Sequence, residues 1–277
     1  MNLFEKITYA LDKTMNTPNN YGWFHLMWIS IILITTILLC LYFKDAKKET
    51  FNKIILVGWI FIVTLEIYKQ INFAFNLDNG IVSWEYSWYA FPFQFCSTPL
   101  YLLPFIIFLN DGKLKDSFLA YMATFSFFGG LVVFIYPNDV FISTIGINIQ
   151  TMIHHGLQIV FGVFIVVYNR NRFNFKFYLK AIPLFAIMIS IALILNIIIY
   201  HAFTNLNIDD TFNMFYISPY FECTLPILSS VYKVMPYSIF LFIYILGFVL
   251  ISFIIYYIEY QILKLLTKRN IKNHATY

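Results

Sequence analysis

Charged residues are scarce in this sequence of 277 residues: Asp, Glu, Lys and Arg make up 12% of it, whereas hydrophobic residues make up 60%. A soluble domain of this length could not bury so much apolar surface, so most of the chain is predicted to lie in a lipid bilayer. Three cysteines are too few for a disulfide framework. The sequence has no long basic run, which argues against a nucleic-acid partner.

Seven apolar segments each approach the roughly 20 residues that a helix needs to cross a bilayer. They cover residues 22–43, 54–75, 91–109, 118–136, 147–168, 179–200 and 237–257. The predicted fold is therefore an all-α polytopic membrane protein with seven transmembrane helices.

The charges of the loops predict the orientation of these helices. Basic residues follow the first, third, fifth and seventh segments, whereas the other loops are mostly acidic. Because cytoplasmic loops carry the excess of Lys and Arg, the N-terminus is predicted outside and the C-terminus in the cytoplasm. The predicted location is the cell membrane, as a multi-pass protein.

Two further regions flank the predicted seven-helix domain of residues 21–260. Residues 1–20 carry Phe4, Ile7, Leu11 and Met15 at helical spacing, which predicts a short amphipathic helix at the membrane surface. Residues 261–277 are predicted to form a basic cytoplasmic tail. The long loop 201–235 contains an apolar stretch and is predicted to fold back over the mouth of the bundle.

Polar residues within the apolar segments gather at one depth. With the orientation above and a rise of about 1.5 Å per residue, they fall in the outer half of the membrane. This predicted outer layer contains His25, Glu66, Lys69, Gln70, Gln94, Cys96, Gln150, His154, His155 and Asn196. Since ionisable residues inside a membrane face the bundle interior or a water-filled cavity, the layer predicts a polar pocket open to the outside.

Most members of the layer also have a simple structural role. Glu66 and Lys69 are three residues apart and can pair on one helix face. The amides, which are Gln94, Gln150 and Asn196, are typical of hydrogen bonds between membrane helices. His25 lies near the interface, where it can act as a polar anchor.

Cys96 differs from Cys40 because it has possible partners at its own depth. A thiol becomes a nucleophile when a base or a positive neighbour favours the thiolate. His154 and His155 point about 100° apart on their helix, so only one of them is expected to face the segment that holds Cys96. The sequence leaves open which one.

Other site types fit the sequence less well. No H-x-x-x-H or H-E-x-x-H motif is present, and neighbouring histidines do not easily bind one ion, so no metal or cofactor is predicted. The last apolar segment has no lysine for a retinal Schiff base. A transporter or a receptor that binds a small or lipidic ligand in the outer pocket remains an alternative.

Four sequence features together resemble a known family. They are FQFCSTPLYLLP at residues 93–104, MIHHG at 152–156, a glutamate in the second segment, and NMFYISPYFE at 213–222. This combination resembles the YwaF family of bacterial membrane proteins. That family is similar to the transmembrane protein 164 type of acyltransferase, which transfers acyl chains between phospholipids.

The resemblance implies a specific chemistry and location. It implies a Cys/His working pair, carried by Cys96 and, of the two histidines, His155. An acyl-thioester would form on Cys96, with Ser97, Thr98 or Gln94 near the oxyanion and Glu66 or His25 orienting the histidine. The implied partners are a membrane phospholipid and a lysophospholipid in a bacterial plasma membrane, and a lipid hydrolase is the related alternative.

Overall fold

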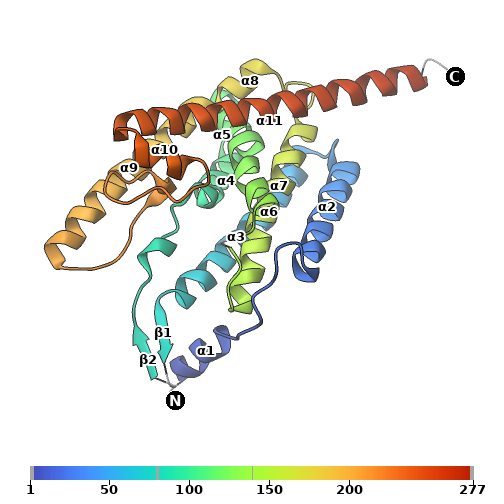
Figure 1. The fold of residues 1–277 in the computed structure, drawn as a ribbon. Coiled ribbons are helices and arrows are strands. Elements are labelled where there is room, and N and C mark those ends of the chain that lie inside the picture. Colours follow the sequence, from blue (N-terminus) through green and yellow to red (C-terminus); the bar gives the residue numbers. More distant parts are fainter. Residues whose placement is uncertain (1–2, 79–80, 139, 275–277) are drawn as a thin grey trace.

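The computed structural model of the protein describes residues 3–78, 81–138 and 140–274 and has a bundle of helices with one short hairpin (Figure 1). Six runs in this part of the chain are long and apolar enough to cross a membrane. They are Trp23–Phe43 (α2), Lys48–Asn72 (α3), Lys113–Ile135 (α5, η3 and α6), Ile145–Tyr168 (α7), Phe175–Leu206 (α8 and α9) and Tyr237–Leu266 (in α11). The predicted all-α, multi-pass membrane fold is confirmed.

The third predicted segment differs from a full-length helix. Its helical part, α4, covers Pro99–Phe108 and follows two single turns, Trp88–Ala90 (η1) and Phe95–Ser97 (η2). Ten residues rise about 15 Å, which is half of the hydrocarbon thickness. The described chain therefore has six full-length helices and one half-length helix. Pro92 and Pro99 explain the break, because proline has no N–H to donate.

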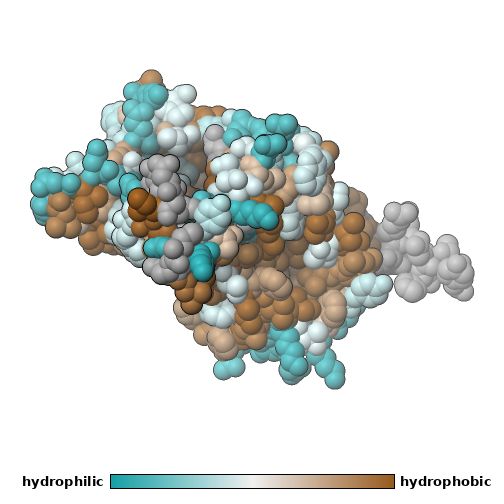
Figure 2. Space-filling model, turned by 90° about the horizontal axis from the view of Figure 1, so that it is seen from below, coloured by the Kyte–Doolittle hydropathy of each residue, from teal (hydrophilic) through white to brown (hydrophobic). Residues whose placement is uncertain are grey.

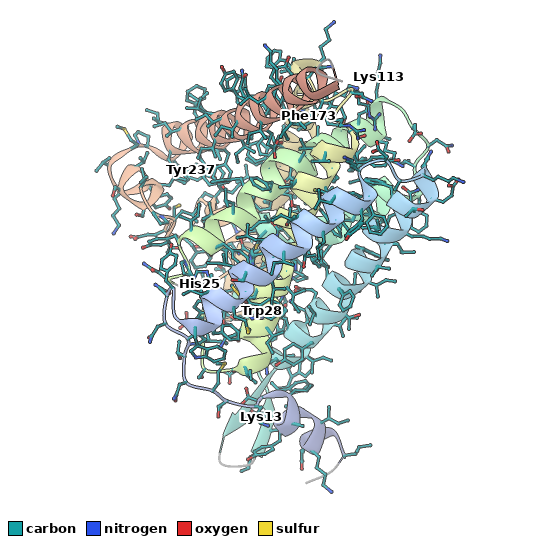
Figure 3. The ribbon with its side chains drawn as sticks, turned by 90° about the vertical axis from the view of Figure 1, so that its right-hand side faces the viewer. Lys13, His25, Trp28, Lys113, Phe173 and Tyr237 are labelled. Carbon is teal, nitrogen blue, oxygen red and sulfur yellow. The ribbon has the colours of Figure 1, made fainter. Side chains whose placement is uncertain are left out.

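The N-terminal segment and the hairpin lie together at one end of the bundle. Helix α1 covers Leu3–Leu11, and strands β1 (Phe75–Asp78) and β2 (Ile81–Trp84) pair antiparallel directly after α3. The Tyr68 hydroxyl donates to the Leu11 carbonyl at 2.8 Å and ties α1 to α3. Figure 3 shows Lys13 at this end, with His25 and Trp28 on the nearer part of α2, and Lys113 at the opposite end.

Helix α7 is the centre of the bundle. It packs against α2, α3 and α6, and glycines let these helices approach closely. A Cβ atom at Gly58 of α3 would lie 2.0 Å from the Phe161 ring of α7, and one at Gly156 would lie 2.2 Å from Ile32 of α2. Each of these glycines therefore marks a contact where no larger residue fits.

The run that pairs with α7 contains a π-helical turn. Helix α5 (Lys113–Tyr121) continues through Met122–Ser126 (η3), a π-helix, into α6 (Phe127–Ile135). All five residues of the π-helix are buried. Such turns occur frequently at functional sites, because they redirect side chains within a helix.

The long loop after α9 (Ala181–Leu206) contains a buried stretch that coincides with its apolar residues. Residues 212–218, called here the buried loop, include the single turn Met214–Tyr216 (η4), and all of them except Tyr216 are buried. Phe215 and Tyr216 have positive φ angles of 58° and 57°, which non-glycine residues rarely adopt. Strong side-chain contacts must hold this conformation.

The last helix is the longest. After the short α10 (Leu228–Val234), α11 covers Tyr237–His274 and projects beyond the other helices at its C-terminal end (Figure 1). The predicted start of the tail at residue 261 falls inside this helix. The outer surface is apolar over broad areas (Figure 2), in keeping with contact to lipid.

We expect Gly58→Ala to destabilise the fold. The new methyl group would force the Phe161 ring, which is 2% exposed, out of its packed position. Overpacking of this kind costs about 1–3 kcal/mol. Thermal melting in detergent should show a lower midpoint for Gly58→Ala, whereas Gly247→Ala, where nothing lies within 4 Å, should melt like the parent protein. Equal melting of both variants would contradict the close α3–α7 contact.

We expect Asn196→Leu to loosen the buried loop. The Asn196 side chain accepts from the Met214 N–H at 2.7 Å and donates to the Met214 carbonyl at 3.0 Å. Each buried backbone group left unpaired costs about 1–3 kcal/mol. Chymotrypsin should therefore cut residues 212–218 faster in Asn196→Leu than in Asn205→Leu, a control at an exposed position of the same helix. Equal cleavage rates would show that Asn196 does not hold the loop.

Candidate functional site

Cys96 lies at the broken start of the half-length helix. It is the middle residue of η2, and its side chain is half-buried. Its own amide N–H and the Ser97 hydroxyl both interact with the thiol. The thiol therefore lies in irregular backbone just before α4.

The backbone carbonyl of Cys96 is held by helix α7. His154 Nε2 lies 2.8 Å and Gln158 Nε2 lies 2.9 Å from this oxygen. The residue three positions further along the chain, Pro99, has no N–H that could satisfy the carbonyl from within the segment. Two side chains one turn apart on α7 therefore replace the missing helical hydrogen bond and fix Cys96 against α7.

The second histidine has a defined tautomer. Its Nδ1 lies 2.8 Å from the Thr151 carbonyl oxygen, which can only accept a hydrogen bond, so Nδ1 carries the proton. The neutral ring of His155 then has its lone pair on Nε2, where it can accept a proton. For His154 the tautomer is the opposite one, since its Nε2 donates to Cys96.

An ion pair on α3 faces these residues. Lys69 Nζ lies 2.8 Å from Glu66 Oε1, and the Gln70 amide donates to the same oxygen at 2.7 Å. The predicted pairing of Glu66 with Lys69 is thus confirmed. Both the Cys96 thiol and the His155 ring lie within electrostatic reach of this pair. The charges of this pair therefore act on the thiol and on the second imidazole.

The Cys96 thiol is not hydrogen-bonded to His154 or His155 in this structure. Within the described chain, no hydrogen bond joins Cys96 Sγ to either ring, and the direct link to α7 runs through the Cys96 carbonyl. The Cys/His pair that the resemblance implies is therefore not present as a hydrogen bond. Catalytic contacts are often open without substrate and close when it binds.

Two residues beside Cys96 complete this polar layer. The Thr98 hydroxyl donates to the Phe95 carbonyl at 2.9 Å, and the fully buried Tyr121 hydroxyl lies next to Thr98 and Cys96. Tyr121 directly precedes the π-helix. Neither Tyr121 nor the role of Gln158 in holding Cys96 follows from the sequence. The spacing of Gln158 four residues after His154, on one helix face, is the only signal for the latter.

The remaining predicted site residues lie in other clusters. Gln94 holds the buried loop, because its amide accepts from Phe215 N–H at 2.9 Å and donates to the Asn213 carbonyl at 3.1 Å. Asn196 holds the same loop through Met214. His25 is enclosed by the rings of Tyr21, Phe134 and Phe141. Gln150 contacts Thr151 on its own helix.

Within the described residues, the three cysteines are not paired with one another, and the acidic and imidazole side chains do not gather around a metal position. Cys40, Cys96 and Cys223 are free thiols. Burial in the loop after α9 raises the pKa of the Cys223 thiol, so this residue is a poor nucleophile. In residues 3–78, 81–138 and 140–274, no group of three or more His, Cys, Asp or Glu side chains has the arrangement of a metal site.

An apolar groove of about 810 Å³ leads to the ion pair on α3. Its walls come from α1, α3, the hairpin and α4, and they include Ile7, Val63, Trp84 and Leu100. Glu66, Gln70 and Tyr86 supply polar groups to the groove. The Tyr86 hydroxyl donates to Gln70 Oε1 at 2.6 Å, and burial raises the pKa of Tyr86 to about 12, so it stays a neutral donor.

Comparison with known proteins gives one result. Neither the curated proteins nor the solved structures include a match. The sequence model of the TMEM164 family matches residues 20–260, which contain the half-length helix α4, the helix α7 with its two histidines, and the buried loop. This match covers most of the chain, and it agrees with the resemblance to transmembrane protein 164 that the motifs around Cys96 and His155 indicate. The chain therefore belongs to the TMEM164 family.

Proposed function

We propose that this protein is a membrane-embedded phospholipid acyltransferase that uses Cys96 as its nucleophile and His155 as its base. The observation that carries the proposal is the clamp of His154 and Gln158 on the Cys96 carbonyl. It places the thiol of a half-length helix beside a helix with two buried histidines, inside the membrane. Family membership supports the same assignment.

In each half of the proposed reaction, His155 takes up one proton and gives one back. Nε2 takes the proton of the Cys96 thiol, and the thiolate attacks the carbonyl carbon of a phospholipid acyl ester. The C–O bond then breaks, the imidazolium returns the proton to the leaving hydroxyl, and a lysophospholipid departs from an acyl-thioester. In the second half, the hydroxyl of another lysophospholipid gives its proton to His155 and attacks the thioester carbonyl. The C–S bond then breaks, and the imidazolium returns the proton to the sulfur, which regenerates the thiol. Water as the acceptor would make the protein a lipid hydrolase.

Groups near Cys96 have suitable chemistry for the other steps. In this proposal, the Cys96 amide N–H and the Ser97 hydroxyl donate to the oxyanion, which their interaction with the thiol supports. His154 acts as a positioning residue, since it holds the Cys96 backbone. Glu66 and Lys69 add a charged pair near His155, in which the carboxylate favours the imidazolium and the ammonium opposes it.

The apolar groove fits the substrate class. Its walls are aliphatic and aromatic, and it opens between helices that are apolar on their outer faces. An acyl chain could therefore enter from the bilayer without crossing water, with its ester near the polar end at Glu66. In the predicted orientation the groove belongs to the outer leaflet of the plasma membrane, where a transacylation that consumes no soluble acyl donor is suitable.

Cys96→Ala should abolish acyl transfer. We expect purified protein, incubated in detergent with phosphatidylcholine radiolabelled in its acyl chains, to acquire a label that neutral hydroxylamine releases, as a thioester requires. Cys96→Ala should carry no such label, because the nucleophile is gone, whereas Cys40→Ala should be labelled like the parent protein. Labelling and turnover that survive in a folded Cys96→Ala variant would refute the mechanism and favour a transporter or receptor.

The two histidines should separate in kinetic tests. His155→Gln removes the proposed base and should lower the rate of acyl transfer by about 10²–10⁴-fold. His154→Gln keeps an N–H donor for the Cys96 carbonyl and should lower the rate less than about tenfold. Both variants should melt like the parent protein, which makes each the control for the other. The reverse order of rates would assign the base to His154.

A further inference from the structure

A polar cavity lies at the end of the bundle opposite α1 and the hairpin. It has a volume of about 510 Å³ and is enclosed by the end of α2, the start of α3, the start of α5 and the end of α7. Helix α4 spans about 15 Å between Cys96 and this end, so the cavity is separate from the candidate site. It is independent of the proposed acyl transfer.

The walls of this cavity carry an excess of positive charge. Five cationic side chains line it, and only two carboxylates, Asp45 and Asp111, do so. The cationic residues are Lys44, Lys48, Lys115, Arg170 and Arg172. Such an excess attracts an anion, particularly where the cavity walls exclude water.

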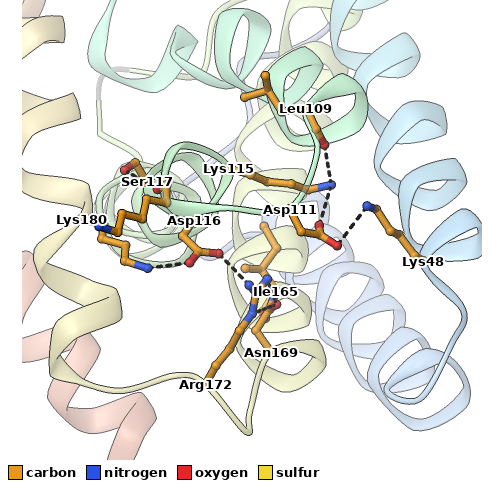
Figure 4. Close-up of polar contacts among 11 residues, drawn as sticks. Lys48, Leu109, Asp111, Lys115, Asp116, Ser117, Ile165, Asn169, Arg172 and Lys180 are labelled. Atoms are coloured by element: carbon orange, nitrogen blue, oxygen red, sulfur yellow. Dashed lines mark hydrogen bonds and ion pairs between the residues drawn. The ribbon is translucent and has the colours of Figure 1, made fainter.

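The carboxylates nearby are already shared between cations (Figure 4). Asp111 pairs with Lys48 at 3.0 Å, and its other oxygen lies 3.7 Å from Lys115. The hydrogen bond from Lys48 holds the pKa of Asp111 below its usual value, so Asp111 is ionised at neutral pH. Both of its oxygens already face a lysine. Asp116, which lies outside the cavity, forms ion pairs with Arg172 at 2.7 Å and with Lys180 at 2.6 Å.

Lys115 is the most buried of these cations and has no carboxylate within hydrogen-bond distance. Its side chain is only 3% exposed and lines the cavity. Its closest acceptor is the neutral Leu109 carbonyl at 3.3 Å, and its carboxylate partner lies beyond hydrogen-bond distance. A buried ammonium is costly without a close anionic partner, so the cavity offers a position for an additional anionic oxygen.

Two further cations extend from this buried ammonium to the cavity mouth. Lys44 forms no ion pair in the described chain, and Arg170, which is partly exposed, pairs with Asp45. Arg170 also donates to the Lys44 and Val167 carbonyls, so it offers the cavity positive charge rather than a free pair of donors. Together with the three lysines that line the cavity, this charge suits a phosphate group. The cavity also lies at the end of apolar membrane helices, which is the level of lipid headgroups.

We infer that this cavity binds a phosphate group, carried either by the headgroup of an anionic phospholipid or by free phosphate. Lys115 contacts the bound oxygens from inside the cavity, and Lys44 and Arg170 close on them from the mouth. The predicted orientation places the site in the cytoplasmic leaflet. An anionic lipid held there would anchor the ends of α2, α3, α5 and α7 to one another.

The test compares phosphate-bearing ligands on purified full-length protein in a neutral detergent. Native mass spectrometry should show tighter binding of dioleoyl phosphatidylglycerol than of dioleoyl phosphatidylcholine. The double variant Lys44→Gln/Arg170→Gln should weaken phosphatidylglycerol binding by about tenfold or more, since each cation near a headgroup contributes about fivefold. The control Lys13→Gln/Lys233→Gln removes two exposed charges at the other end of the bundle and should change binding less than twofold.

A third variant has the opposite expected sign. Asp45→Asn removes an exposed competing carboxylate and should tighten binding, so a folding defect cannot imitate its effect. Inorganic phosphate identifies the source: displacement of phosphatidylglycerol at millimolar phosphate indicates a free-phosphate site, and no displacement indicates a lipid site. Equal binding of the two lipids without phosphate binding, or equal losses in both double variants, would overturn the inference.

Discussion

Two hydrogen bonds from α7 to one carbonyl oxygen, that of Cys96, hold the break in the half-length membrane helix together. Irregular backbone within a bilayer is stable only where protein groups satisfy it, because lipid offers no hydrogen bonds. Pro99 removes the donor that the helix itself would supply. His154 and Gln158 therefore have a structural role before any catalytic one, and the position of the thiol depends on that role.

On the other side of the segment that carries Cys96, side-chain amides also bind irregular backbone that has no helical hydrogen bonds. Gln94 and Asn196, from different helical elements, bind the backbone of the buried loop, and the Tyr244 hydroxyl donates to the Phe215 carbonyl at 2.8 Å. These contacts hold two positive φ angles and press Phe215 against Phe93 and Phe95. The loop consequently forms one wall around η2, so the surroundings of Cys96 come from segments far apart in sequence.

The bundle thus has two chemically different ends. Near α1 and the hairpin, an apolar groove is lined by Glu66, which belongs to the largely buried ion pair with Lys69. At the other end, cations outnumber carboxylates around a polar cavity. A lipid has the same division between acyl chain and charged headgroup, and the proposed acyl transfer and the inferred phosphate site each use the matching half of that chemistry.

The sequence by itself determined the membrane class, six of the helices, the Glu66–Lys69 pair and the apolar stretch of the loop after α9, because apolar length and helical spacing are local properties. It also singled out Cys96, His154 and His155 as neighbours in depth. Only the tertiary structure decided that the third segment is a half-length helix, that α7 holds the Cys96 carbonyl and that His25 lies apart. It likewise assigned Gln94 and Asn196 to the buried loop. Those outcomes depend on which helix faces meet and on which backbone groups lack a donor, and neither is encoded in the spacing of residues along one segment.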